Sequence, residues 1–223
     1  MAIELGAAGA KLALVGRDRE KLDETAAGIA DAAVFLTDVT DETQVRALEQ
    51  AVRERFGRVD ILINNAGMNI RKPFEAYTEA EFDHIIGVHV KGMFFMAQAV
   101  YPAMAARGRG CIINIASQRG LKGAVNAAPY SAAKAAIIGF TRSLSWEAAP
   151  KGVRVNAIAP GPIDTDLTAT MTPADRQAFI NALPAGRFGR PEEIAATALL
   201  LAGPQGGFYV GACLSPNGGD VMH

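Results

Sequence analysis

Three side chains in the middle of the sequence have the types and spacing that proton transfer requires. Tyr130 and Lys134 lie four residues apart, so a helix there would place them on one face with Cβ atoms ~5–6 Å apart. An ammonium group beside a phenol favours the phenolate and lowers a pKa that starts near ~10. Ser117, at the end of the preceding apolar run, adds a hydroxyl that can face the phenol. The set predicts proton transfer to or from a carbonyl or alcohol oxygen, although such a Tyr–Lys pair also arises by chance.

The chain around these residues alternates between short apolar stretches and stretches with helical character. Near-continuous apolar strands separated by helices indicate an α/β fold, a doubly wound parallel sheet covered by helices on both faces. A helix end is expected at 1–8, with Gly9 after it. Strands are expected at 11–15, 34–36, 59–63, 111–115, 153–158 and 212–214, and helices at 17–30, 41–56, 79–106, 126–149, 165–183 and 191–202. Asp41 is expected to cap the second of these helices, and Gly87 and Gly92 to interrupt the third.

Polar or turn-forming residues follow five of the predicted strands at their carboxyl ends. In parallel α/β sheets, ligands bind beyond this edge. A ligand site is therefore expected there, built from residues at the ends of the strands. These residues are Arg17, Asp38, Asn65, Ser117 and Pro160–Gly161.

The composition is that of a globular protein. The 223 residues are 50% hydrophobic and 20% charged, and no linker or repeat divides them, so one domain over 1–223 is expected. A net charge of −1 gives no argument for nucleic acid or an anionic membrane as a partner. Cys111 and Cys213 lie in separate predicted strands, which favours free thiols in a reducing compartment. With no apolar run of ~18 residues and no signal peptide recognised, the cytoplasm is the expected location. No metal site is predicted.

Several motifs in this order resemble those of the short-chain dehydrogenases/reductases. They are Asn64-Asn65-Ala66-Gly67, then Ser117, Tyr130 and Lys134, then the stretch from Pro160 to Thr165. Among subgroups, the chain is similar to 3-oxoacyl-carrier-protein reductases and to sugar-acid dehydrogenases such as gluconate 5-dehydrogenase. The resemblance implies a Rossmann-type fold, a nicotinamide cofactor, and hydride transfer between a carbonyl and a secondary alcohol on a small molecule.

The resemblance also implies a role for each matching residue. Tyr130 would be the general acid or base, Lys134 would lower its pKa and bind the nicotinamide ribose, and Ser117 would bind the substrate oxygen. The remaining positions would bind cofactor: Asp38 and Val39 flank the adenine, Asn65, Ala66 and Gly67 line the adenosine ribose side, and Ile163 and Thr165 contact the nicotinamide carboxamide.

Arg17 bears on which nicotinamide cofactor is used. Enzymes that prefer NAD usually have an acid at the end of this strand to bind the ribose 2′-hydroxyl. Here Gly16 stands there, followed by Arg17, a planar donor suited to a 2′-phosphate. NADP(H) is therefore favoured over NAD(H), and a solvated surface arginine is the alternative explanation.

The sequence departs from the family pattern in two places. His89 stands in the long helix where the family has an asparagine that supports a water relay to the lysine. Histidine also donates and accepts, so the relay can survive, and a core histidine satisfied by backbone groups is the equal alternative. The first strand of the family's sheet and the Gly-rich loop after it are missing from the sequence. We expect this to leave the strands at 11–15 and 59–63 without a shared neighbour, and about 20 preceding residues to be needed for cofactor binding.

Two functional hypotheses follow. The first is an NADP(H)-dependent oxidoreductase that interconverts a carbonyl and a secondary alcohol. The second is a truncated, catalytically silent relative that serves as a structural or regulatory subunit. The complete Ser–Tyr–Lys set favours the first.

Substrate choice and assembly are less directly encoded. Segments 68–74, 118–128 and 165–183 are expected to set specificity, and Arg71 and Lys72 hint at an anionic substrate, although solvated surface charge explains them as well. The helices at 79–106 and 126–149 are apolar on more than one side, which indicates burial on more than one side. The family pairs these helices across a two-fold axis, so a homotetramer or homodimer is expected.

Overall fold

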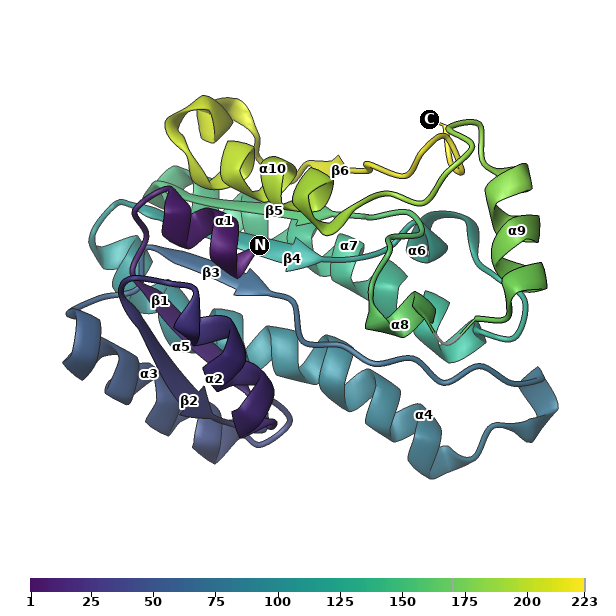
Figure 1. The fold of residues 1–223 in the computed structure, drawn as a ribbon. Coiled ribbons are helices and arrows are strands. Elements are labelled where there is room, and N and C mark those ends of the chain that lie inside the picture. The colour runs from purple at the N-terminus through teal and green to yellow at the C-terminus, as the bar shows by residue number, and fades with distance from the viewer. Residues whose placement is uncertain (170, 223) are drawn as a thin grey trace.

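The computed structural model describes residues 1–169 and 171–222 and has the expected Rossmann-like α/β architecture (Figure 1). Its strands are β1 (Leu12–Gly16), β2 (Ala32–Leu36), β3 (Ile61–Asn64), β4 (Gly110–Ile115), β5 (Val153–Ile158) and β6 (Cys213–Leu214). Its α-helices are α1 (Ala2–Ala7), α2 (Arg19–Ala27), α3 (Glu42–Phe56), α4 (Glu79–Ile86), α5 (Gly92–Ala106), α6 (Arg119–Lys122), α7 (Ala128–Ala148), α8 (Asp166–Ala169), α9 (Pro173–Ala182) and α10 (Pro191–Ala202). Short turns η1 (Phe74–Ala76), η3 (Ala149–Lys151) and η4 (Pro204–Phe208) are 3₁₀-helical, and η2 (Gly87–Lys91) is π-helical.

The central sheet is parallel, with strand order β3-β4-β5-β6. Side chains alternate between its two faces, as the pleat requires. Ile112 and Val155 pack toward the helices α5 and α7, whereas Cys111 and Ile113 pack toward α10. Both faces are therefore buried, which explains why the strands read as almost continuous apolar runs.

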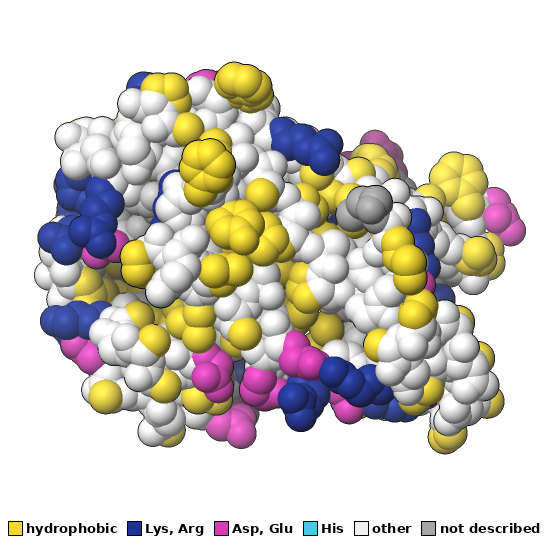
Figure 2. Space-filling model, turned by 90° about the horizontal axis from the view of Figure 1, so that it is seen from above, with side chains coloured by type: hydrophobic (Ala, Val, Ile, Leu, Met, Phe, Trp, Pro, Cys, Tyr) yellow, Lys and Arg dark blue, Asp and Glu magenta, His cyan; other side chains and the backbone are white. Residues whose placement is uncertain are grey.

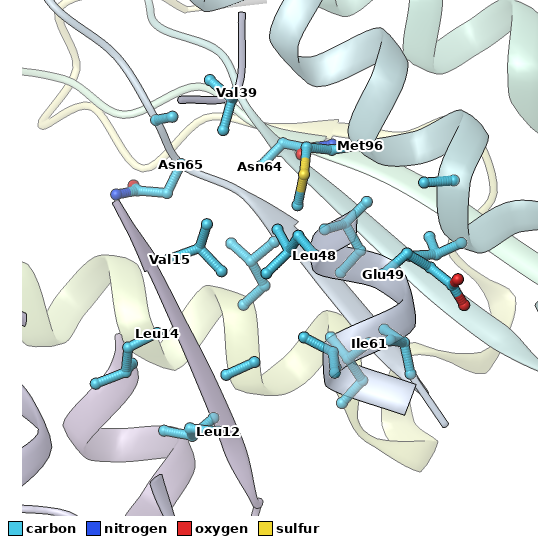
Figure 3. Close-up of a pocket in the computed structure, with 18 of the residues that line it drawn as sticks. Leu12, Leu14, Val15, Val39, Leu48, Glu49, Ile61, Asn64, Asn65 and Met96 are labelled. Atoms are coloured by element: carbon cyan, nitrogen blue, oxygen red, sulfur yellow. The ribbon is translucent and has the colours of Figure 1, made fainter. Parts of the chain in front are cut away.

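Strands β1 and β2 form a separate parallel pair, set apart from the four-stranded sheet in Figure 1. Among the described residues, β1 pairs only with β2, and β3 pairs only with β4. A cavity of about 940 Å³ lies between them, lined by β1, β3, α3 and α5. In Figure 3, Leu12, Leu14 and Val15 lie along one side of this cavity, and Ile61 and Asn64 lie along the other. Two strand edges thus face each other across an apolar gap.

Local sequence signals account for the ends of the helices. Asp41 accepts hydrogen bonds from the backbone N–H groups of Thr43 and Gln44 and so caps α3, as expected. The helix predicted at 79–106 is three segments, broken at Gly87 and Gly92 as expected, because the π-helical turn η2 separates α4 from α5. Gly92 at the start of α5 allows close approach, since a Cβ there would lie 2.8 Å from the Val39 side chain.

Cys111 and Cys213 are free thiols, as predicted, and burial raises the pKa of each. Within the described part of the chain, no helix has both the length and the hydropathy needed to cross a membrane.

Candidate active site

Ser117, Tyr130 and Lys134 come together at the carboxyl end of β4. Ser117 follows β4, and its Oγ accepts a hydrogen bond from the Arg119 backbone N–H at 3.2 Å. Tyr130 and Lys134 lie one turn apart on α7, with the Lys134 Nζ 5.6 Å from the centre of the Tyr130 ring. Ser117 and Tyr130 line one cavity of about 470 Å³, which we call the reaction pocket. Hydroxyl, phenol and ammonium therefore lie together, as their spacing predicts.

Lys134 lies beneath the pocket rather than in its wall. Its side chain is buried, and Nζ donates a hydrogen bond to the backbone carbonyl of Ile115 at 2.7 Å. Burial disfavours the ammonium form and lowers the pKa of Lys134 to about 8. The carbonyl at the end of β4 thus fixes the lysine head group directly behind Tyr130.

The expectation of an acidified phenol is wrong for this structure. The pKa of Tyr130 is raised, chiefly because burial disfavours the phenolate, while the Ser117 hydroxyl and the Arg119 guanidinium lower it by less. Lys134 donates its hydrogen bond to the Ile115 carbonyl rather than to the phenol, and burial lowers the pKa of the ammonium group itself. Tyr130 consequently holds its proton at neutral pH, the state that a general acid needs for reduction of a carbonyl.

His89 occupies the π-helical turn η2 and is buried behind Tyr130. The two rings meet edge to face with centres 5.3 Å apart. The shortest contact, 2.7 Å from Nε2 to the carbonyl oxygen of Met68, assigns the proton to Nε2. Nδ1 is then a buried acceptor with no hydrogen-bond donor among the described residues. Burial, reinforced by the charge of Lys134, lowers the pKa of His89 to about 4, so the imidazole is neutral at pH 7.

The residues assigned to the adenosine end lie outside the reaction pocket, after β1, β2 and β3. Arg17 and Asp38 form an exposed ion pair, with Nη1 3.6 Å from Oδ2. The pKa of Asp38 is lowered mainly by hydrogen bonds from the Thr40 backbone N–H and hydroxyl. The remaining predicted residues are Val39, which lines the cavity between β1 and β3, and the Asn65, Ala66 and Gly67 turn, which is exposed.

Ile163 and Thr165 lie in the wall of the reaction pocket with Ser117 and Tyr130. Ile163 pairs with Gly189 through an isolated bridge, and the Thr165 backbone N–H donates to the Thr168 hydroxyl at 3.0 Å. The structure therefore brings together the residues predicted to meet the reacting end of a cofactor and substrate.

A nicotinamide dinucleotide fits the donor sets at its two ends. Ser117, Tyr130 and Lys134 offer hydroxyl and ammonium donors for the nicotinamide riboside end, and Arg17 offers an exposed guanidinium for the adenosine end. Residues 1–223 hold no glycine-rich turn between these ends, and the facing edges of β1 and β3 occupy that place. The chain thus offers hydrogen-bond donors to both ends of a dinucleotide, but residues 1–223 offer no glycine-rich turn to its pyrophosphate.

Of the two cations that the sequence suggested for the site, Arg71 and Lys72, the reaction pocket contains only Arg71 among its described lining residues. Lys72 forms a 2.5 Å ion pair with Glu81 and is not among the described residues that line the pocket, so it does not contribute the free charge suggested for it. Arg71 lines the pocket, and so does Arg119, which was not singled out. Arg119 could have been predicted as a site residue, because it follows Ser117 by two positions at the carboxyl end of a strand.

The chain is similar in sequence and in structure to known reductases and related proteins. A family model described as enoyl-(acyl carrier protein) reductase matches residues 1–220. Nodulation protein G of Azospirillum brasilense is 43% identical over 182 residues, 82% of this chain and 74% of that protein. A 3-oxoacyl-acyl-carrier-protein reductase of Thermotoga maritima is 35% identical over 84% of this chain and 76% of its own length. The crystal structure of levodione reductase superposes with a TM-score of 0.93 at 35% identity, covering 98% of this chain and 90% of that one.

Proposed function

Because the chain belongs to the short-chain dehydrogenase/reductase family and is an oxidoreductase of carbonyl and CH–OH groups, we propose that it uses NADP(H), with Tyr130 as the general acid/base. The observation that carries the proposal is the shared pocket of Ser117 and Tyr130, with Lys134 fixed behind them by a 2.7 Å hydrogen bond. A cytoplasmic location is part of the same proposal.

In the reducing direction, Ser117 donates a hydrogen bond to the substrate carbonyl and holds it against Tyr130. The nicotinamide supplies the hydride when it is bound. Tyr130 gives its proton to the alkoxide that develops on the carbonyl oxygen, and the Lys134 ammonium stabilises the phenolate that remains. Neutral His89 packs against the Tyr130 ring, and its unpartnered Nδ1 can accept a hydrogen bond from a water in a relay that carries a proton from solvent to the Tyr130 phenolate.

We further propose that dinucleotide binding depends on one more strand, inserted between β1 and β3. Both edges run in the same direction along an apolar cavity, so an inserted parallel strand would pair with each of them (Figure 3). The glycine-rich turn after such a strand would supply the backbone N–H groups that a pyrophosphate needs. We use the term strand-extended chain for this protein preceded by a strand of about six apolar residues and the glycine-rich turn Thr-Gly-x-x-x-Gly-x-Gly.

The proposed activity is tested by following NADPH consumption with a panel of ketones. The strand-extended chain is expected to oxidise NADPH only when a carbonyl substrate is added, and to reduce NADP with the matching alcohol. NADPH fluorescence enhancement on binding gives a readout that needs no substrate. A folded strand-extended chain that neither binds NADPH nor turns over any ketone would favour a silent subunit instead.

Arg17 is expected to decide the preference for NADPH over NADH. Replacing Arg17 with Ser removes the guanidinium proposed to bind the 2′-phosphate, so the ratio of NADPH to NADH affinity should fall about tenfold or more in the strand-extended chain. Arg19→Ser is the matched control, since Arg19 is equally exposed and pairs with Asp23 on α2. An unchanged ratio in Arg17→Ser would contradict this assignment of cofactor.

We expect the chain to assemble as a dimer or tetramer through α5 and α7. Phe94 on α5 is 43% exposed and Trp146 on α7 is 84% exposed, and burying them would remove apolar surface from water. Figure 2 shows further apolar side chains at the surface, interspersed with charged ones. Phe208, in η4, is fully exposed.

Light scattering should give a multiple of the chain mass, and Phe94→Asp should lower it. Phe74→Asp, on the exposed turn η1, is the control and should leave it unchanged. A stable monomer at micromolar concentration would count against assembly.

A further inference from the structure

The reaction pocket contains two guanidinium groups, Arg71 and Arg119, that form no ion pair within the described part of the chain. Arg119 lies beside the reacting phenol, with its guanidinium carbon 6.0 Å from the centre of the Tyr130 ring. Arg71 enters the same pocket from the turn after β3. Burial lowers the pKa of Arg119, the charge of Arg71 lowers it further, and Tyr130 and Asp220 oppose the shift by less.

Nearby carboxylates are already engaged with other groups. Lys122 pairs with Asp220, and Arg176 pairs with Asp164 at 2.9 Å. Asp175 lines the pocket from α9, and its carboxylate accepts a hydrogen bond from the Thr172 hydroxyl at 2.7 Å. The charged groups that face the pocket are therefore Arg71, Arg119 and Asp175, with a net charge of +1.

Two amide oxygens in the lining of the reaction pocket have no hydrogen-bond donor among the described residues. Gln118 is only 4% exposed, yet its Oε1 accepts no hydrogen bond, and the Asn69 Oδ1 in the same pocket is also unpartnered among the described residues. Buried amide oxygens normally have a donor. The lining therefore combines cations and unpartnered acceptors with apolar side chains that include Phe179 and Phe188. Such a pocket suits a ligand with an anionic end, a hydroxyl or water beside it, and a short hydrocarbon part.

We propose that the substrate is an oxo acid or the corresponding hydroxy acid, bound through its anionic group by Arg119 with help from Arg71. Arg119 is then a specificity-determining residue. Its position beside Tyr130 requires the anion and the reacting carbonyl to lie close together in one small molecule. This proposal rests on the proposed function, because it names the substrate class of the same pocket.

The test measures binding to the 223-residue chain without any dinucleotide, so that it does not depend on hydride transfer. The probes are 4-oxopentanoate and its neutral methyl ester, which share one carbon skeleton and differ in charge. Ligand-observed NMR should show the acid bound about tenfold more tightly than the ester, since a hydrogen bond between charged groups is worth roughly that factor. Added salt should reduce the difference.

Substitutions at Arg119 test whether the preference for the acid over the ester arises in the reaction pocket. Arg119→Gln should abolish the difference between acid and ester, and Arg119→Lys, which keeps the charge, should retain part of it. Arg109→Gln is the matched control, because Arg109 is an exposed arginine at the opposite end of β4 with no ion pair among the described residues. Circular dichroism checks that each variant is folded.

Equal binding of acid and ester, binding of neither, or an acid preference that survives in a folded Arg119→Gln chain would each overturn the proposal. Failure of the proposed function is recognised separately, since it leaves acid binding intact and removes only NADPH-dependent turnover in the strand-extended chain.

Discussion

Replacing Tyr130 with Phe is expected to lower kcat of the strand-extended chain by about 100- to 10,000-fold, the range that general acid–base catalysis contributes. The substitution removes one oxygen and keeps the ring that packs edge to face against His89. Fold and cofactor affinity should therefore stay close to those of the parent chain. The measurement is turnover at saturating ketone and NADPH, together with a melting curve.

Tyr101→Phe is the control for this substitution. The Tyr101 hydroxyl donates to the Glu147 carbonyl at 3.2 Å, remote from the pocket, so its loss should leave kcat unchanged. Near-normal turnover in a folded Tyr130→Phe chain would mean that another group transfers the proton.

The pH profile gives an independent check on Tyr130. Reduction needs the protonated phenol, whose pKa is raised by burial, and the Lys134 ammonium, whose pKa burial lowers to about 8. Its rate should therefore be constant through neutral pH and begin to fall near pH 8 as Lys134 loses its proton. Oxidation needs the phenolate and should rise in the alkaline range. Burial lowers the pKa of His89 to about 4, so the imidazole stays neutral from pH 6 to 8 and should contribute no inflection to the profile in that range.

The second large effect is expected from filling the gap between β1 and β3. The 223-residue chain should bind NADP(H) poorly or not at all, and the strand-extended chain should bind it and melt at a higher temperature. Each buried backbone group left unpaired costs about 1–3 kcal/mol. Pairing even a few of them should raise Tm by roughly 6–12 °C, since ~1 kcal/mol shifts a domain of this size by ~2–4 °C.

A matched leader separates strand insertion from the mere addition of residues. Two prolines at the centre of the added strand remove ladder donors and should cancel both the rise in Tm and the binding of NADPH. The intact mass must be confirmed in each case. Tight NADPH binding by a chain whose mass matches 223 residues would contradict the prediction.

Much of the framework could be predicted because its signals are local. The strand at 153–158 and the helix at 191–202 have the predicted boundaries, since apolar runs and the Pro191 start mark them directly. Asp41 could be identified as a cap from its type and position. Tyr130 and Lys134 share a helix face because helical periodicity alone requires it.

What could not be predicted depends on contacts between distant segments. The spacing of Tyr130 and Lys134 says nothing of their burial, and burial reverses the expected shift in the pKa of Tyr130. Arg71 and Arg119 meet only because the turn after β3 and the start of α6 converge on one pocket. The ion pair of Lys72 with Glu81 likewise depends on how the turn packs on α4.

The π-helical turn η2 sets how α4 and α5 face relative to each other. A π turn holds one residue more than the α-helical turn it replaces, and each residue of an α-helix turns it by about 100°. If Gly87–Lys91 closed as plain α-helix with the same number of residues, the extra residue would no longer be absorbed, and α4 would rotate relative to α5 by roughly that angle. Fully buried Ile85 would swing toward solvent, and His89 would leave the back of Tyr130. The register of the catalytic face is therefore set by a single extra residue.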